Sequence, residues 1–203
     1  MHSCVQRFLF CACAILLYSP LTAAVDLESA KRAYAEKDFA TAAKEFTAAA
    51  EQGNAEAQRI VGKMYMIGQG VPKDAEQAIK WFKAAAGQGD ADAQFFLGAM
   101  YLLPKKDLAE GVKWLRLSAA QGMQDAQYLL GKTYMQGTPD LPTDPVQGAM
   151  WLRLAAKENK QYYADELNAA EKQMTPDQIA RAQALAADWK PKASAESVPG
   201  EKQ

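Results

Sequence analysis

The sequence is nearly devoid of two residue types that carry much of protein chemistry, cysteine and histidine. Its 203 residues include three cysteines and one histidine: Cys4, Cys11, Cys13 and His2. The rest of the chain therefore cannot form a disulfide bond, use a thiol nucleophile or bind a metal through imidazole. No serine begins a Ser-x-x-Lys nucleophile motif. We expect no catalytic residue, no metal and no cofactor.

An excess of one charge sign is also lacking. Lysine and arginine number 23 against 24 aspartates and glutamates, so the formal net charge is −1. A chain so close to neutral has no electrostatic reason to bind the phosphates of nucleic acid. We therefore expect no nucleic-acid partner. Hydrophobic residues at 49% and charged residues at 23% are typical of a globular protein.

The one long apolar run, Phe8 to Tyr18, follows Arg7 and precedes a small-residue end at Thr22-Ala23-Ala24. This layout is typical of a secretory signal peptide, and the run is short for a membrane span. We predict a signal peptide at residues 1–24, cut after Ala24, and a periplasmic or secreted protein. An uncleaved anchor is the alternative. Cleavage would remove every cysteine and the histidine.

What the sequence has instead is a repeat. The segments AEAQRIVGKMY, ADAQFFLGAMY and QDAQYLLGKTY begin at Ala55, Ala91 and Gln124, and a tryptophan-containing segment follows each. A spacing of 33 to 37 residues predicts stacked supersecondary units. The recurring positions are a glycine at Gly62, Gly98 and Gly131, a tyrosine at Tyr65, Tyr101 and Tyr134, and a tryptophan at Trp81, Trp114 and Trp151.

Apolar residues follow one helical face in both halves of each unit, so each unit is predicted to be an antiparallel pair of helices. The fold class is then all-α, a solenoid of helical hairpins. A glycine inside a helix costs roughly 0.5–1 kcal/mol relative to alanine. Three at one repeat position predict that the paired helix approaches closely there, with small residues at Ala78, Gly111 and Gly148. The tyrosines and tryptophans should fill the wedges between hairpins.

The ends of a repeat array are expected to be atypical, because one face meets water. Residues 25–53 read as a degenerate tetratricopeptide-like repeat. Residues 161–189 read as capping helices, the second of which starts with a Thr175 cap and Gln178 three residues on. Residues 190–203 are polar and contain proline, and are predicted to be a disordered tail.

The repeat units resemble the Sel-1-like repeat, a relative of the tetratricopeptide repeat. The stretch MIGQGVPKDAEQAIKWFKAAAGQG follows the family pattern nearly throughout, whereas LLPKKDLAEG in the second copy lacks the Gly-x-Gly-Val loop. Three copies cover residues 54–89, 90–122 and 123–160. The resemblance implies a right-handed solenoid, first helices that line a concave surface, and a role in protein interaction.

The face of the first helices opposite the core stripe is the candidate binding surface. An apolar column of Met66, Leu102 and Met135 with basic residues nearby suits an extended peptide or an amphipathic helix. The alternative is that these side chains pack against the neighbouring hairpin. The complete predicted set is Arg59, Lys63, Met66, Phe95, Ala99, Leu102, Tyr128, Lys132 and Met135.

These residues favour a non-catalytic scaffold that binds another envelope or secreted protein. Two alternatives involve cell-wall glycan: a peptidoglycan-associated binder, or a hydrolase that uses carboxylates. Glu56, Asp92 and Asp125 recur at one repeat position, and a glycosidase needs two carboxylates about 5–9 Å apart. The simpler interpretation is that these acids are solvated and favour the positive ends of their helices.

Overall fold

The computed structural model describes residues 27–102, 107–137, 141–157 and 161–192. The predicted signal peptide and residues 193–203 of the predicted tail lie outside these ranges. The described part of the chain forms ten helices: α1 (Leu27–Ala35), α2 (Phe39–Glu51), α3 (Ala55–Ile67), α4 (Ala75–Gly87), α5 (Ala91–Leu102), α6 (Leu108–Ala120), α7 (Gln124–Gln136), α8 (Pro145–Ala155), α9 (Gln161–Glu171) and α10 (Pro176–Asp188).

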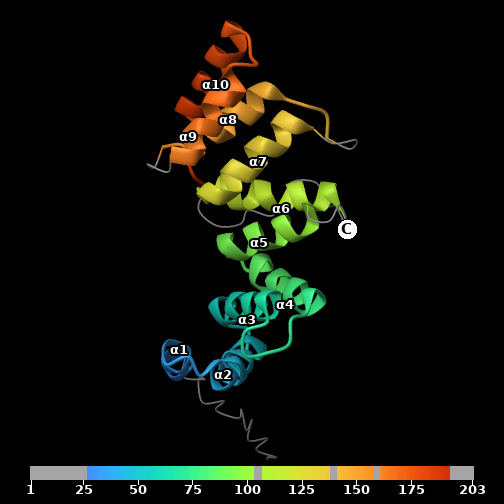
Figure 1. Cartoon of the computed structure of the whole chain (residues 1–203), viewed down its shortest axis with the longest axis vertical. Coiled ribbons are helices and arrows are strands. Elements are labelled where there is room, and N and C mark those ends of the chain that lie inside the picture. The colour runs from blue at the N-terminus through green and yellow to red at the C-terminus, as the bar shows by residue number, and fades with distance from the viewer. Residues whose placement is uncertain (1–26, 103–106, 138–140, 158–160, 193–203) are drawn as a thin grey trace, which may run out of the picture.

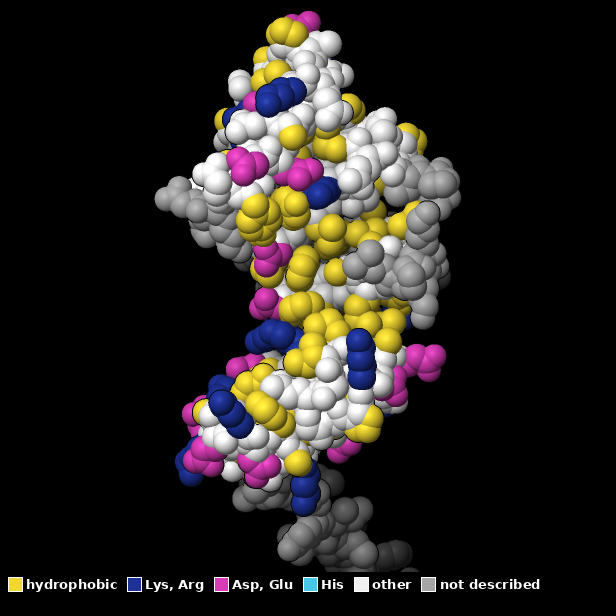
Figure 2. Space-filling view, viewed as in Figure 1, with side chains coloured by type: hydrophobic (Ala, Val, Ile, Leu, Met, Phe, Trp, Pro, Cys, Tyr) yellow, Lys and Arg dark blue, Asp and Glu magenta, His cyan; other side chains and the backbone are white. Residues whose placement is uncertain are grey.

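Consecutive helices pair as hairpins, and the hairpins stack into an elongated solenoid with α1 and α2 at one end and α10 at the other (Figure 1). The second helix of each hairpin packs against the first helix of the next, as α2 does against α3 and α4 against α5. At the far end α9 and α10 both pack against α8. The predicted all-α solenoid of helical hairpins is confirmed. Apolar side chains gather in the middle of one face, over α5 to α7 (Figure 2).

None of the helices in these ranges combines the length and the apolar character that a bilayer crossing requires.

Each second helix of the four hairpins starts at an aspartate whose side chain accepts a hydrogen bond from a backbone N–H of the first turn. These bonds satisfy amides that would otherwise have no partner in the helix. The Thr175 and Gln178 cap of α10 is confirmed as a full capping box.

The helix-interior glycines mark close approach of paired helices, as predicted. A β-carbon built at Gly98 would lie 2.8 Å from Leu115 Cγ and 3.0 Å from the carbonyl oxygen of Gly111. Real β-carbons essentially never come within 3.0 Å of another heavy atom. A larger residue at this crossing of α5 and α6 would therefore displace the Leu115 side chain or α6 itself.

The crossing recurs in the neighbouring hairpins. In α7 a β-carbon at Gly131 would lie 2.8 Å from Leu152 Cγ and 2.9 Å from the Gly148 oxygen. At Gly62 the nearest atoms to a built β-carbon belong to the Phe82 ring, at 2.8 Å. The residue after each tryptophan thus fills the space that the glycine leaves open.

The tryptophans lie half-buried between successive hairpins. Trp81 of α4 packs on the apolar cluster built by α1, α2 and α3. Trp114 of α6 packs on the cluster of α4 and α5, and Trp151 of α8 on that of α6 and α7. Each tryptophan thus joins its own first helix to the second helix of the preceding hairpin, which confirms the predicted filling of the wedges.

A set of buried glutamines, which the sequence interpretation missed, links the repeats through hydrogen bonds. Gln94 is 1% exposed, and its Nε2 donates to the carbonyl oxygen of Ala86 at 3.2 Å. Gln58 and Gln127 make the equivalent bonds, at 3.0 Å and 3.1 Å, to the second helix that precedes them. Each of these carbonyls also accepts the backbone N–H of a glycine in the turn that follows, so the glutamine adds a second hydrogen bond, one that joins two hairpins.

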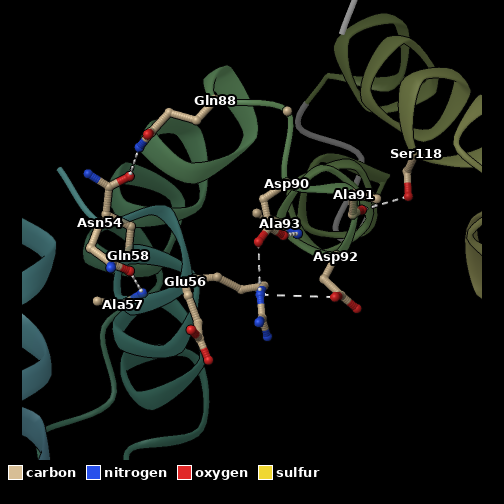
Figure 3. Close-up of polar contacts among 12 residues, drawn as sticks. Asn54, Glu56, Ala57, Gln58, Gln88, Asp90, Ala91, Asp92, Ala93 and Ser118 are labelled. Atoms are coloured by element: carbon tan, nitrogen blue, oxygen red, sulfur yellow. Dashed lines mark hydrogen bonds and ion pairs between the residues drawn. The ribbon is translucent and has the colours of Figure 1, made fainter. Parts of the chain in front are cut away.

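A second glutamine extends this link in two of the repeats. Gln88 Nε2 donates to Gln58 Oε1 at 2.7 Å (Figure 3). Gln121 Nε2 donates to Gln94 Oε1 at 2.8 Å. The signal in the sequence was the Ala-Gln pair that recurs with the same spacing as the glycines. Its role depends on the preceding hairpin, which periodicity within one helix does not show.

The C-terminal segment folds back along the stack. Trp189 directly follows α10, and its ring lies 6.3 Å from that of Trp151 and against Gly122. The backbone N–H of Lys192 donates to the carbonyl oxygen of Ala120 at 2.8 Å. Residues 190–192, where the predicted disordered tail begins, are therefore held against the end of α6.

Substitution of Gly131 tests the close approach. We expect Gly131→Ala to lower the free energy of unfolding by about 1–3 kcal/mol, since the new methyl group would meet the α8 backbone and Leu152. Gly87→Ala is the matched control: a β-carbon there meets nothing within 4 Å, so a gain of up to about 1 kcal/mol is expected. Urea denaturation measures both. Similar changes in the two variants would contradict the close approach.

Candidate binding groove

The predicted surface residues of α3 and α5 lie in contact with neighbouring elements. Arg59 Nε is 3.0 Å from Asp90 Oδ2 and 4.0 Å from Asp92 Oδ2 (Figure 3). Lys63 Nζ lies 5.1 Å from the centroid of the Phe96 ring. Both basic side chains of α3 thus reach across to α5 or to the turn before it.

The predicted apolar column is half-buried and packs within the stack. A β-carbon at Gly111 would lie 3.2 Å from Leu102, and one at Gly148 would lie 2.8 Å from Met135 Cγ and Sδ. Met66 likewise packs on the cluster of α4 and α5. The small residues of the second helices leave room that these side chains occupy. The alternative of packing within the stack therefore describes the column better.

The two remaining predicted residues of α5 are also half-buried. Phe95 packs on the apolar cluster of α6 and α7, with its ring 5.3 Å from the Phe96 ring. Ala99 follows Phe95 by one helical turn and is also half-buried. A binding role for these residues stays a prediction, and the structure shows them engaged within the solenoid.

At the C-terminal end α9 covers the predicted residues of α7. The Tyr128 ring lies 5.3 Å from Tyr162 and 5.0 Å from Tyr163, both of α9. Lys132 Nζ is 3.4 Å from Tyr128 Oη and 3.5 Å from Glu166 Oε2. The bond to Tyr128 raises the pKa of the Lys132 ammonium, and Glu166 adds to the effect. The sequence predicted α9 as a cap without predicting what it covers.

Buried Tyr163 anchors this arrangement. Its hydroxyl donates to Asp125 Oδ1 of α7, and the side chain is fully buried. Burial raises the pKa of the Tyr163 phenol well above its ordinary value, and the bond to Asp125 contributes in the same direction.

The recurring carboxylates join first helices to one another. Glu56 of α3 lies 3.3 Å from Lys31 of α1, and this bond raises the pKa of the Lys31 ammonium. Asp92 lies near Arg59, and Asp125 accepts from Tyr163. The three acids are therefore engaged with cations or a phenol of neighbouring helices. Among the residues that the structure describes, no group of three or more acidic, histidine or cysteine side chains could hold a metal ion.

An open groove lies at the N-terminal end, between α1 and α3. Its volume is about 310 Å³. It contains two of the four large hydrophobic side chains that are exposed in the described ranges, Tyr34 at 40% and Ile67 at 58%. The lining residues are Lys31, Tyr34, Phe46, Glu56, Ile60, Lys63, Met64, Ile67 and Gln69.

Helix α2 forms the floor of the groove, since fully buried Phe46 belongs to it. One end is bridged by the Lys31–Glu56 pair, and the other by the Tyr34 hydroxyl, which donates to Gln69 Oε1 at 2.8 Å. The earlier residue of α1, Lys31, pairs with the start of α3, and the later one, Tyr34, bonds to Gln69 just after the end of α3. Helices α1 and α3 therefore run in the same direction. From Glu56 to Ile67 the groove extends about 16 Å, at 1.5 Å per helical residue.

Of the nine residues predicted to bind a partner, Lys63 alone lines this groove. The sequence interpretation missed Tyr34 and Ile67. Ile67 is the last residue of α3 and directly follows Met66, which was in the predicted set. Tyr34 belongs to the degenerate repeat at residues 25–53, for which no binding role was predicted. An apolar residue at the exposed end of a first helix was the available signal.

Tyr163→Phe tests the contact between α7 and α9. Loss of the bond to Asp125 is expected to lower the free energy of unfolding at pH 7 by about 1.5–3 kcal/mol. The pKa of the Tyr163 phenol is raised in the folded protein, whereas the pKa of an unfolded tyrosine is about 10. The contribution of the phenol to the free energy of unfolding is therefore fully present below about pH 10 and declines as the pH rises above about 10. As the pH is raised from about 9 to about 11, the free energy of unfolding measured by urea denaturation should therefore fall less for the variant than for the parent.

Tyr101→Phe is the control for this variant, because the Tyr101 hydroxyl has no hydrogen bond within the described residues. Its effect should stay within about 0.5 kcal/mol. A Tyr163→Phe protein as stable as the parent at every pH would contradict the anchoring role.

Comparison with known proteins agrees with the repeat architecture. The family model of the Sel1 repeat matches residues 55–90, 91–123 and 124–160, over half of the chain. The crystal structure of a Sel1 repeat protein from Oxalobacter formigenes is similar, with a TM-score of 0.67 and 27% identity over 80% of this chain and 70% of that one.

A protective antigen of uropathogenic Escherichia coli that displays an SLR fold is 28% identical over 79% of this chain. The TM-score is 0.41, and the match covers 46% of the antigen chain. No curated protein matches. Sel1 repeat proteins generally serve as scaffolds for protein interaction. With its three consecutive repeats, the chain belongs to the Sel1 repeat family.

Proposed function

We propose that this protein is a non-catalytic scaffold of the bacterial cell envelope that binds a peptide or helix of another envelope or secreted protein. The observation that carries the proposal is the groove between α1 and α3, with Tyr34 and Ile67 exposed in it. The envelope location rests on the signal-peptide pattern of the first 24 residues.

The groove has the character of a side-chain docking site. Its volume is at the lower end of the roughly 300–1,000 Å³ that is usual for ligand pockets. Ile60, Met64 and Ile67 follow one another along one face of α3. An apolar strip of this kind accepts the anchor side chains of an amphipathic segment, while the backbone of that segment stays outside.

The glycan-directed alternatives have weaker support. Glu56 pairs with Lys31, Asp92 lies 4.0 Å from Arg59 Nε, and Asp125 accepts a hydrogen bond from Tyr163. These contacts join helices of the solenoid. A hydrolase would need a pair of carboxylates directed at a substrate in a shared cleft. The groove contains a single carboxylate, Glu56.

Site-specific cross-linking tests the proposal. A photoreactive residue placed at position 67 of the full chain should cross-link, in intact cells, to a defined segment of one envelope protein. The same residue at position 185 is the control, because Leu185 of α10 is similarly exposed, at 43% against 58% for Ile67. Mass spectrometry of the adduct identifies the segment, which should carry apolar residues at helical spacing.

Ile67→Glu should abolish capture of that partner by the chain. Its stability should change by less than about 0.5 kcal/mol, since Ile67 is exposed. Leu185→Glu should leave capture intact. Equal cross-linking from positions 67 and 185, or full capture by Ile67→Glu, would refute groove binding.

A further inference from the structure

Lys63 differs from the other basic residues of the first-helix face in having no acidic partner. Lys31 pairs with Glu28 and Glu56. Arg59 pairs with Asp90, and Lys132 pairs with Glu166. Within the part of the chain that the structure describes, no ion pair joins Lys63 to a carboxylate, and its contact is the Phe96 ring.

The position of Lys63 places this charge beside the apolar strip of the groove. Ile60, Lys63, Met64 and Ile67 follow the helical spacing of one face of α3, and all four line the groove. The other two charged residues of the lining, Lys31 and Glu56, are bonded to each other at 3.3 Å. The lining therefore presents apolar side chains with one positive charge that no carboxylate of the described residues neutralises.

The size of the groove favours a helix over an extended chain. A volume of about 310 Å³ holds a few side chains and not a backbone as well. Anchors at positions i, i+4 and i+7 of a helix span about 10 Å, which fits within the groove length of about 16 Å. Such anchors would lie against Ile60, Met64 and Ile67, the apolar strip of α3 that lines the groove.

We infer, on the basis of the proposed function, that the occupant is an amphipathic helix of a partner protein that carries an acidic side chain beside its apolar anchors and pairs it with Lys63. A carboxylate there gains a charge-assisted bond in a half-buried setting. A basic side chain at the same place would meet Lys63 with no acidic neighbour to offset the repulsion. The charge thus selects among amphipathic helices with the same apolar pattern.

The test uses two fluorescein-labelled synthetic helical peptides with leucine at i, i+4 and i+7. One has glutamates beside the leucines and the other has lysines at the same positions. Fluorescence anisotropy with the full chain measures both affinities at about 0.05 M and 0.5 M salt, where screening differs strongly. The acidic peptide should bind at least about fivefold more tightly at low salt, and the difference should shrink at high salt.

Lys63→Glu should reverse this preference. Lys80→Glu is the matched control, because Lys80 of α4 also lies over an aromatic ring, 5.4 Å from the centroid of Trp81, but is outside the groove. It should keep the parent's preference. Equal binding of the two peptides, tighter binding of the basic one, no binding of either, or an equal effect of Lys80→Glu would each overturn the inference.

The two proposals can fail separately. If both peptides bind equally and Ile67→Glu abolishes both, the groove binds helices without charge selection, and only the role of Lys63 is wrong. If neither peptide binds although position 67 still cross-links to a partner, the helix chemistry is wrong and the scaffold function stands. If cross-linking at position 67 fails as well, the proposed function is also wrong.

Discussion

The solenoid depends on one repeated interaction, the buried hydrogen bond from a glutamine of each first helix to the end of the second helix before it. Gln58, Gln94 and Gln127 each donate a second hydrogen bond to a carbonyl at the end of the preceding second helix, which also accepts the backbone N–H of a turn glycine. A hydrogen bond of this kind contributes about 0.5–1.5 kcal/mol to stability. The bond therefore fixes where one hairpin begins relative to the last, and the glycine crossings then set how closely the two helices within a hairpin pack.

This spacing explains why the first-helix face is closed in the middle and at its C-terminal end but open at its N-terminal end. Leu102 and Met135 fill the space over the glycines of α6 and α8, and α9 lies over Tyr128. Between α1 and α3 no comparable side chain of the described ranges fills the space above Phe46, and Tyr34 and Ile67 are exposed there. The groove is thus a consequence of where the repeat pattern breaks down.

The sequence predicted the features that recur in each repeat unit, but not all of the contacts that side chains make with neighbouring hairpins. Periodicity predicts the helical hairpins, the glycine crossings and the packing of Trp81, Trp114 and Trp151, because one motif recurs in three copies every 33 to 37 residues. The predicted binding face was derived from the helical wheel of single helices, which does not record that Gly111 makes room for Leu102 or that α9 returns over Lys132. The glutamines were visible as a motif, but their partners lie in the preceding hairpin.

The most direct test of this account is the free energy of unfolding of Gln94→Leu, measured by urea denaturation of the full chain. Leucine is similar in size but cannot bond to Ala86, and it also removes one of the two acceptors of Gln121, the other being the Gly89 carbonyl oxygen. We expect a loss of about 1–3 kcal/mol and a broader transition, as coupling between the second and third hairpins weakens. Unchanged stability with an equally steep transition would show that the glutamines do not hold the repeats together.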